Sequence, residues 1–171
     1  MNILQEFDTI AAIATPIGTG GVGVIRISGD KSFEIVDKIY SKHNLEEGKI
    51  SHGWVVDGDK KIDEVILLPF KNPKSYTGED VIEIHCHGGI NVVRNILDIV
   101  LKNGARMAER GEFTKRAFMN KKMDLSQAEA VADLIHAKTR DFAKQSAKNL
   151  SGALSPVSYT HLRAHETRSN L

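Results

Sequence analysis

The sequence predicts an α+β fold, with a domain of mixed strands and helices followed by one long helix. Short apolar runs rich in β-branched residues, separated by glycine-rich and polar turns, occupy the first part of the chain. Amphipathic helical patterns lie between these runs, and from Met123 onward the periodicity is helical only. A composition of 41% apolar and 26% charged residues is typical of a globular protein and leaves no reason to expect disorder.

The first part is predicted to contain several strands and two amphipathic helices. Strands are expected at 9–14, 22–28 and 80–87, with a hairpin over 54–68 and a helix over 90–102. Asp57-Gly58 supplies the hairpin turn. Asp30 or Ser32 is expected to cap the first helix, and Asn103-Gly104 to end the second.

The segment from Gly111 to Ile135 carries the strongest local signals. Residues 111–118 predict one or two helical turns, which the sequence 120–122 interrupts. Ser126 and Glu129 match a capping box, so a helix is expected to begin near Asp124 and to run unbroken to about Leu154. The rest of the chain cannot fully cover its narrow apolar stripe, which indicates one helix of an incomplete bundle.

The single cysteine, Cys86, rules out a disulfide framework and a cysteine-rich zinc site, and it favours a reducing cytoplasm. No apolar run approaches the ~20 residues that span a bilayer. The N-terminus carries acidic residues instead of a basic segment before an apolar one, so no signal peptide is expected.

The glycine-rich segment Gly18–Gly23 superficially suggests nucleotide binding. A strand pattern follows it, whereas the dinucleotide fingerprint requires a helix, and no P-loop sequence occurs. Two readings remain. The segment is a tight connection between strands, or its small residues let a flat ligand lie against the backbone near Arg26.

Three charged residues are candidate site residues. Arg26 lies within an apolar strand pattern, where it is either solvated on an edge strand or forked onto a carboxylate. Glu83, between two isoleucines, is either paired, directed toward a ligand or simply exposed by strand alternation. Lys122 precedes the long helix and could simply be solvated.

His85-Cys86-His87 looks like a metal-binding cluster. Strand alternation places the two histidines on one face and Cys86 on the other, so the three cannot converge, and no metal site is predicted. Cys86 is expected to be a small buried residue.

Three motifs carry a family resemblance. They are Ala14–Gly29 (ATPIGTGGVGVIRISG), Ser75–Gly89 (SYTGEDVIEIHCHGG) and Gly111–Ile135 (GEFTKRAFMNKKMDLSQAEAVADLI). In this order they resemble the N-terminal domain and helical-domain start of the MnmE (TrmE) family of bacterial tRNA-modifying GTPases. The resemblance implies an aminomethyltransferase-like, folate-binding fold that binds 5-formyltetrahydrofolate through Arg26, Glu83 and Lys122, with no catalytic residue.

The resemblance also implies a domain plan and partners. Residues 1–121 would form the folate-binding and dimerisation domain, residues 122–155 would begin the helical domain, and residues 156–171 resemble translated vector sequence that is unrelated and disordered. The implied partners are a second copy of the chain in a homodimer, an MnmG-type flavoprotein, and tRNA, whose wobble uridine is modified. The resemblance implies no membrane association. GTP, potassium and magnesium would bind a G domain, which is expected to be absent here together with the family's terminal cysteine.

Two other functions stay open at this stage. One is a free-standing folate-dependent enzyme of the aminomethyltransferase type. The other is a non-catalytic module for dimerisation or RNA contact. The excess of basic over acidic residues between Lys102 and Lys148 suits RNA phosphates or a solvated helix face.

Overall fold

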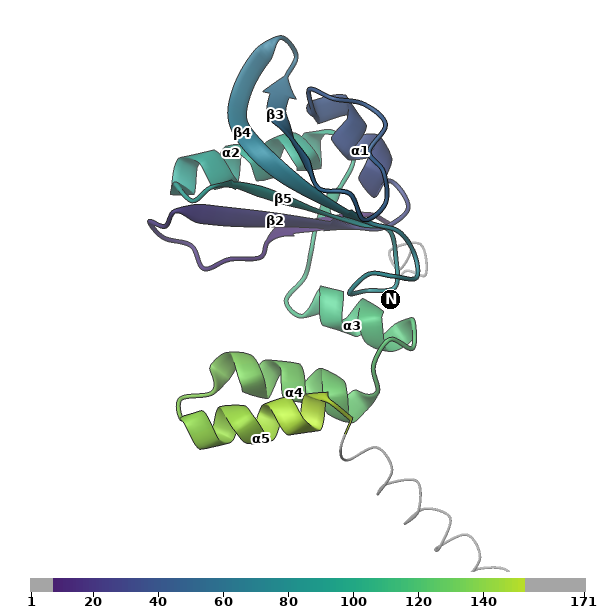
Figure 1. Cartoon of the computed structure of the whole chain (residues 1–171), viewed down its shortest axis with the longest axis vertical. Coiled ribbons are helices and arrows are strands. Elements are labelled where there is room, and N and C mark those ends of the chain that lie inside the picture. The colour runs from purple at the N-terminus through teal and green to yellow at the C-terminus, as the bar shows by residue number, and fades with distance from the viewer. Residues whose placement is uncertain (1–7, 153–171) are drawn as a thin grey trace, which may run out of the picture. The chain divides into compact units, whose positions relative to one another are not determined.

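The computed structural model describes residues 8–152, which divide between Phe113 and Thr114 into two compact units. The first unit contains β1 Ile10–Ile13, β2 Val22–Ser28, α1 Ser32–Ile39, β3 Ser51–Asp57, β4 Lys60–Phe70, β5 Val81–His87, α2 Ile90–Lys102 and β6 Arg106–Met107. Helix α3, Glu112–Met119, begins in the first unit and continues into the second, which also contains α4 Leu125–His136 and α5 Arg140–Leu150. The predicted mixture of sheet and helix is confirmed (Figure 1).

The strands of the first unit form one six-stranded sheet in the order β3-β4-β5-β2-β1-β6. All neighbouring pairs are antiparallel except β1 and β6, which pair in parallel. The strands and the hairpin expected from the sequence are confirmed. The sequence did not predict β6, because a strand of two residues carries no periodicity.

Helices α1 and α2 lie against the same face of this sheet (Figure 1). Ile25 and Ile27 of β2 and Ile84 of β5 are fully buried there, together with Ile96 and Val100 of α2. Each such side chain contributes about 1.5–3 kcal/mol through burial. Strand alternation directs the residues between them to the opposite face, called here the open face because neither α1 nor α2 lies on it.

The predicted cap of α1 is wrong. The N-cap residue is Lys31, and neither Asp30 nor Ser32 caps the helix through its side chain. Thr9 supplies an acceptor instead, because its hydroxyl receives the Lys31 N–H at 3.0 Å. Ser32 instead donates to the carbonyl of Gly29 at 2.7 Å.

The glycine turns around the hairpin and α2 are as predicted. Gly58 in the hairpin turn has φ 60° and Gly104 beyond α2 has φ 117°, which non-glycine residues rarely adopt. The predicted short helix before 120–122 is also confirmed as α3. Lys121, with φ 58°, ends it.

The second unit contains two helices where the sequence predicted one. Helix α4 ends at His136, and Thr139, in extended conformation, accepts a hydrogen bond from the Phe142 N–H at 3.2 Å and begins α5. A threonine hydroxyl that caps a new helix competes with continuation of the old one. The side-chain amide of Gln127 donates through Nε2 to the backbone carbonyl of Leu150 at 2.9 Å, so the start of α4 lies beside the end of α5 in a helical hairpin.

The capping box of α4 also differs from the prediction. Asp124 is the N-cap: its Oδ1 accepts the Gln127 N–H at 2.8 Å, and the Gln127 side chain accepts the Asp124 N–H at 2.9 Å. Ser126 and Glu129 match the same sequence pattern but lie two residues too late, since the helix has already begun at Leu125. The predicted unrelated segment 156–171 lies outside the described residues.

Candidate functional site

Arg26 and Glu83 are direct neighbours across β2 and β5 on the open face of the sheet. Nε and Nη2 of Arg26 both lie close to Oε1 of Glu83, at 2.9 and 2.8 Å. Strand β2 lies between β5 and β1, so the reading of Arg26 as a solvated edge-strand residue is wrong. Its side chain is 25% exposed and that of Glu83 18%, so the pair is half-buried but still reachable from solvent.

His85 adds a second partner to Glu83. Its Nε2 lies 3.2 Å from Oε2 of Glu83, the oxygen that Arg26 leaves open. Burial by itself would raise the pKa of Glu83, but the hydrogen bonds from Arg26 and His85 and their charges outweigh it and lower the pKa below its ordinary value. The carboxylate is therefore ionised at neutral pH.

Two aromatic rings contact the Arg26 guanidinium. The ring centroids of Tyr76 and Phe113 lie 5.0 and 5.5 Å from Cζ of Arg26, within the range of cation–π attraction. A cavity of about 290 Å³ adjoins the pair on this face, lined by Phe70, Lys74, Ser75, Tyr76, Val81 and Glu83. The site thus combines an acceptor, a cation and aromatic surface.

The sequence did not predict the roles of Tyr76 and Phe113. Tyr76 lies in the loop between β4 and β5, and Phe113 lies at the start of α3, where the sequence predicted only one or two helical turns. The only signal for Tyr76 is its place in the same motif as Glu83. Their convergence on Arg26 depends on how three distant segments fold together.

Lys122 belongs to the second unit. Its side chain is exposed, and its backbone N–H donates to the carbonyl of Ala117 at 2.9 Å, which closes the end of α3. The structure therefore brings together two of the three predicted site residues, Arg26 and Glu83. The assignment of Lys122 to the same site stays a prediction.

The His85-Cys86-His87 segment alternates as predicted. Cys86 is 4% exposed and its thiol donates to the carbonyl of Gly23, whereas His87 lies on the other face and pairs with Asp63 at 2.7 Å. Burial, with the Asp63 charge adding to it, raises the pKa of Cys86 to about 11. Cys86 is thus a small core residue, and between residues 8 and 152 no group of histidine, cysteine and carboxylate side chains is arranged to hold a metal ion.

The glycine-rich segment connects β1 to β2, and a strand follows it as predicted. A Cβ on Gly23 would overlap Val93, and one on Gly88 would overlap the Gly20 carbonyl, so these glycines permit close packing. The segment lines another cavity of about 290 Å³, together with Ile13 and Val93. Arg26 is not among its lining residues, since it faces the other side of the sheet.

Among residues 8–152, no helix has the length and apolar character that crossing a bilayer requires.

Fold and site define an α+β domain with a charged, aromatic-lined site on the open face of its sheet, followed by a helical hairpin. The family model described as "GTP-binding protein TrmE N-terminus" matches residues 9–122. The chain therefore belongs to the TrmE N-terminus family, as its three motifs predicted.

Curated relatives extend this match. The chain is 54% identical over 157 residues to the tRNA modification GTPase MnmE of Caldicellulosiruptor saccharolyticus, covering 88% of this chain and 34% of the relative. It is 52% identical to the MnmE proteins of Thermotoga maritima, over 86% of this chain and 33% of the relative, and Lactiplantibacillus plantarum, over 95% and 36%. The chain spans about a third of the length of the curated relatives it matches.

Proposed function

We propose that this chain is the N-terminal part of a tRNA-modifying GTPase and that its first unit binds a reduced folate, 5-formyltetrahydrofolate, at Arg26 and Glu83. Family membership and relatives named tRNA modification GTPase MnmE support the first statement. The chain's own role is binding, and it contributes no catalytic residue. The fold of residues 1–121 is proposed to be aminomethyltransferase-like.

The observation that carries the folate proposal is the ion pair on the open face beside an aromatic-lined cavity. Oε2 of Glu83 accepts one hydrogen bond from His85 and has a second lone pair for a ligand N–H. Among the described residues, Arg26 pairs with Glu83 only through Nε and Nη2, so the N–H groups of Nη1 can donate to a ligand carbonyl. An acceptor beside a donor complements the N–H and C=O edge of a pterin ring.

The cavity supports the same ligand class. Its volume of about 290 Å³ lies at the small end of ligand pockets, which suits a ring system instead of a whole folate. The ring of Tyr76 offers a flat surface for stacking. Lys122 is proposed to bind the polar end of the ligand, where a cation would pair with its carboxylates.

The wider assembly follows from the family. Residues 122–155 are proposed to begin the helical domain, and residues 1–121 to form a homodimer. An MnmG-type flavoprotein and tRNA are the proposed partners in the cytoplasm. GTP, potassium and magnesium are proposed to bind in the part of the longer relatives that this chain does not span.

Isothermal titration calorimetry with 5-formyltetrahydrofolate tests the binding. Glu83→Gln and Arg26→Lys are each expected to weaken binding at least about tenfold, since each removes part of a half-buried charged contact. Arg94→Lys, an exposed change on α2, is the control and should bind like the wild type. Wild-type protein that gives no heat, or variants that bind equally well, would contradict the proposal.

Sedimentation velocity over a range of protein concentrations tests the dimer. A monomer at every concentration would contradict this part.

A further inference from the structure

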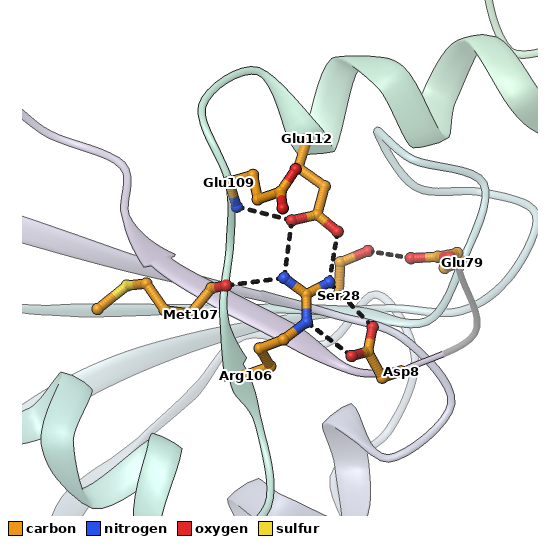
Figure 2. A network of polar contacts seen from close by, with 7 residues as sticks. All are labelled: Asp8, Ser28, Glu79, Arg106, Met107, Glu109 and Glu112. Atoms are coloured by element: carbon orange, nitrogen blue, oxygen red, sulfur yellow. Dashed lines mark hydrogen bonds and ion pairs between the residues drawn. The ribbon is translucent and has the colours of Figure 1, made fainter. Parts of the chain in front are cut away.

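A second charged network lies in the same unit, apart from the Arg26–Glu83 pair. We call it the Arg106 clasp; it consists of Asp8, Arg106 and Glu112 (Figure 2). It ties together three segments, the residues that precede β1, strand β6 and the first residue of α3. Asp8 and Arg106 are 98 residues apart in sequence.

The guanidinium of Arg106 uses all of its nitrogens. Nε and Nη2 donate to the two oxygens of Asp8 at 2.6 and 3.1 Å, and Nη2 and Nη1 donate to the two oxygens of Glu112 at 2.7 and 3.2 Å. Nη1 also donates to the Met107 carbonyl at 3.0 Å. The five contacts match the five N–H groups of an arginine, so no lysine could replace it fully.

Glu112 connects this clasp to the start of α3. It is 8% exposed, and its carboxylate also accepts the backbone N–H of Glu109 at 2.6 Å. The hydrogen bonds with Asp8 and Glu112 raise the pKa of Arg106. Each carboxylate accepts two hydrogen bonds from the guanidinium, and this bidentate geometry fixes the orientation of both groups. Glu112, the first residue of α3, is therefore held beside β6 at the edge of the sheet.

The residue after Glu112 is Phe113, whose ring lies over Arg26. We propose that Arg106 is a positioning residue for the Arg26–Glu83 site: its clasp on Asp8 and Glu112 holds Phe113 against the Arg26 guanidinium. This rests on the proposed function for the part that concerns ligand affinity. Arg106 touches neither Arg26 nor the cavity beside Glu83.

The clasp is proposed to act by restricting the conformations of the Arg26 side chain. A free arginine side chain has many rotamers, and fixing them before a ligand arrives reduces the entropy that binding must overcome. Glu83 and the two rings hold the guanidinium in one position. Releasing Phe113 would leave Tyr76 and Glu83 alone to do so.

The experiment uses the full chain with Arg106→Lys, which keeps the positive charge but loses the bidentate hydrogen bonds to Asp8 and Glu112. Glu112→Gln keeps the size of the residue and one acceptor, and serves if Arg106→Lys does not fold. Phe113→Leu removes the ring directly. Arg94→Lys on α2 is the matched control.

The first readout needs no ligand. Hydrogen exchange of the Arg26 Nε–H, followed by NMR, is expected to be about three- to tenfold faster in the clasp variants and in Phe113→Leu, as loss of a cation–π contact predicts. The combination of Arg106→Lys with Phe113→Leu should be no faster than Phe113→Leu alone, because both changes act through the same ring.

The second readout is affinity for 5-formyltetrahydrofolate, expected to fall by a similar factor. A wild type that binds no folate would remove the proposed function, while the exchange of Arg26 would still decide the role of Arg106. The proposal would be overturned if Arg106→Lys and Glu112→Gln lower the melting temperature but leave hydrogen exchange of the Arg26 Nε–H as in the wild type. The clasp would then be purely structural.

Discussion

Gly23 of β2 and Val93 of α2 lie so close that a β-carbon on residue 23 would overlap Cγ2 of Val93. Val93 is almost fully buried, and its β-branched side chain has few rotamers with which to move away. Helix–sheet packing thus explains why position 23 is a glycine.

Gly23→Ala is expected to lower the free energy of unfolding by about 1–3 kcal/mol, as overpacking of a core does. Urea unfolding followed by circular dichroism measures this. Gly21→Ala is the control, because nothing lies within 4 Å of its Cβ position, and it should be nearly neutral. Adding Val93→Ala to Gly23→Ala should recover part of the loss, and no recovery would show that the overlap is not the cause.

The Arg26–Glu83 pair should give a characteristic pH dependence. The folded-state pKa of Glu83 is lowered, so its stabilising effect is fully present above the unfolded value of about 4.3 and is lost as pH falls through the lower folded value. At neutral pH, Glu83→Gln should cost about 1–3 kcal/mol, because it weakens the contacts of a half-buried guanidinium.

The stability difference between wild type and Glu83→Gln should therefore shrink below about pH 4.3. Urea unfolding at pH 7, 5 and 3.5 measures it. A difference that stays constant or grows toward low pH would contradict the lowered pKa.

Cys86 is expected to react slowly with thiol reagents in the folded protein. Its pKa of about 11 leaves little thiolate at pH 8, and the residue is 4% exposed. Labelling by an aromatic disulfide reagent should be at least about a hundredfold slower in buffer than in 6 M guanidinium, since both burial and ionisation oppose it. Equal rates in the two solvents would place Cys86 outside the core.

The capping residue of α4 can be tested by a pair of variants. Asp124→Ala should destabilise the helical hairpin by about 1 kcal/mol, because it removes the N-cap, while Ser126→Ala should be nearly neutral. Amide hydrogen exchange in α4 reports on this helix separately from the first unit. A larger loss for Ser126→Ala than for Asp124→Ala would instead support the predicted capping box of Ser126 and Glu129.

Thr139 offers a parallel test of the break between α4 and α5. Thr139→Ala is expected to weaken α5 by about 1 kcal/mol, because Phe142 N–H loses its acceptor. Amide exchange of Phe142 and the following turn should accelerate. Unchanged exchange there would mean that Thr139 does not define the start of α5.

Periodicity predicted β2, β5 and α2 well, because each buries alternate or every third and fourth residue over seven or more positions. It did not separate α4 from α5, since the apolar stripe continues in phase across residues 137–139 and only the Thr139 cap marks the break. The cap of α1 was missed for a related reason: Thr9, which supplies the acceptor, lies 22 residues away.

The candidate site was predictable only in part. An arginine within an apolar strand requires an acceptor, which the sequence indicated. That Glu83 is this acceptor depends on β2 pairing with β5, a strand more than fifty residues later. Tyr76 and Phe113 come from a loop and a helix start, where no repeating pattern indicates which way a side chain points.

The alternation along β2 has one more consequence. Ile25 and Arg26 are adjacent yet face opposite sides of the sheet. If β2 slipped by one residue against β5, every side chain of the strand would change face, the guanidinium would enter the apolar core and Glu83 would lose its partner. The charged pair therefore disfavours a one-residue slip of these strands during folding, whatever ligand the open face binds.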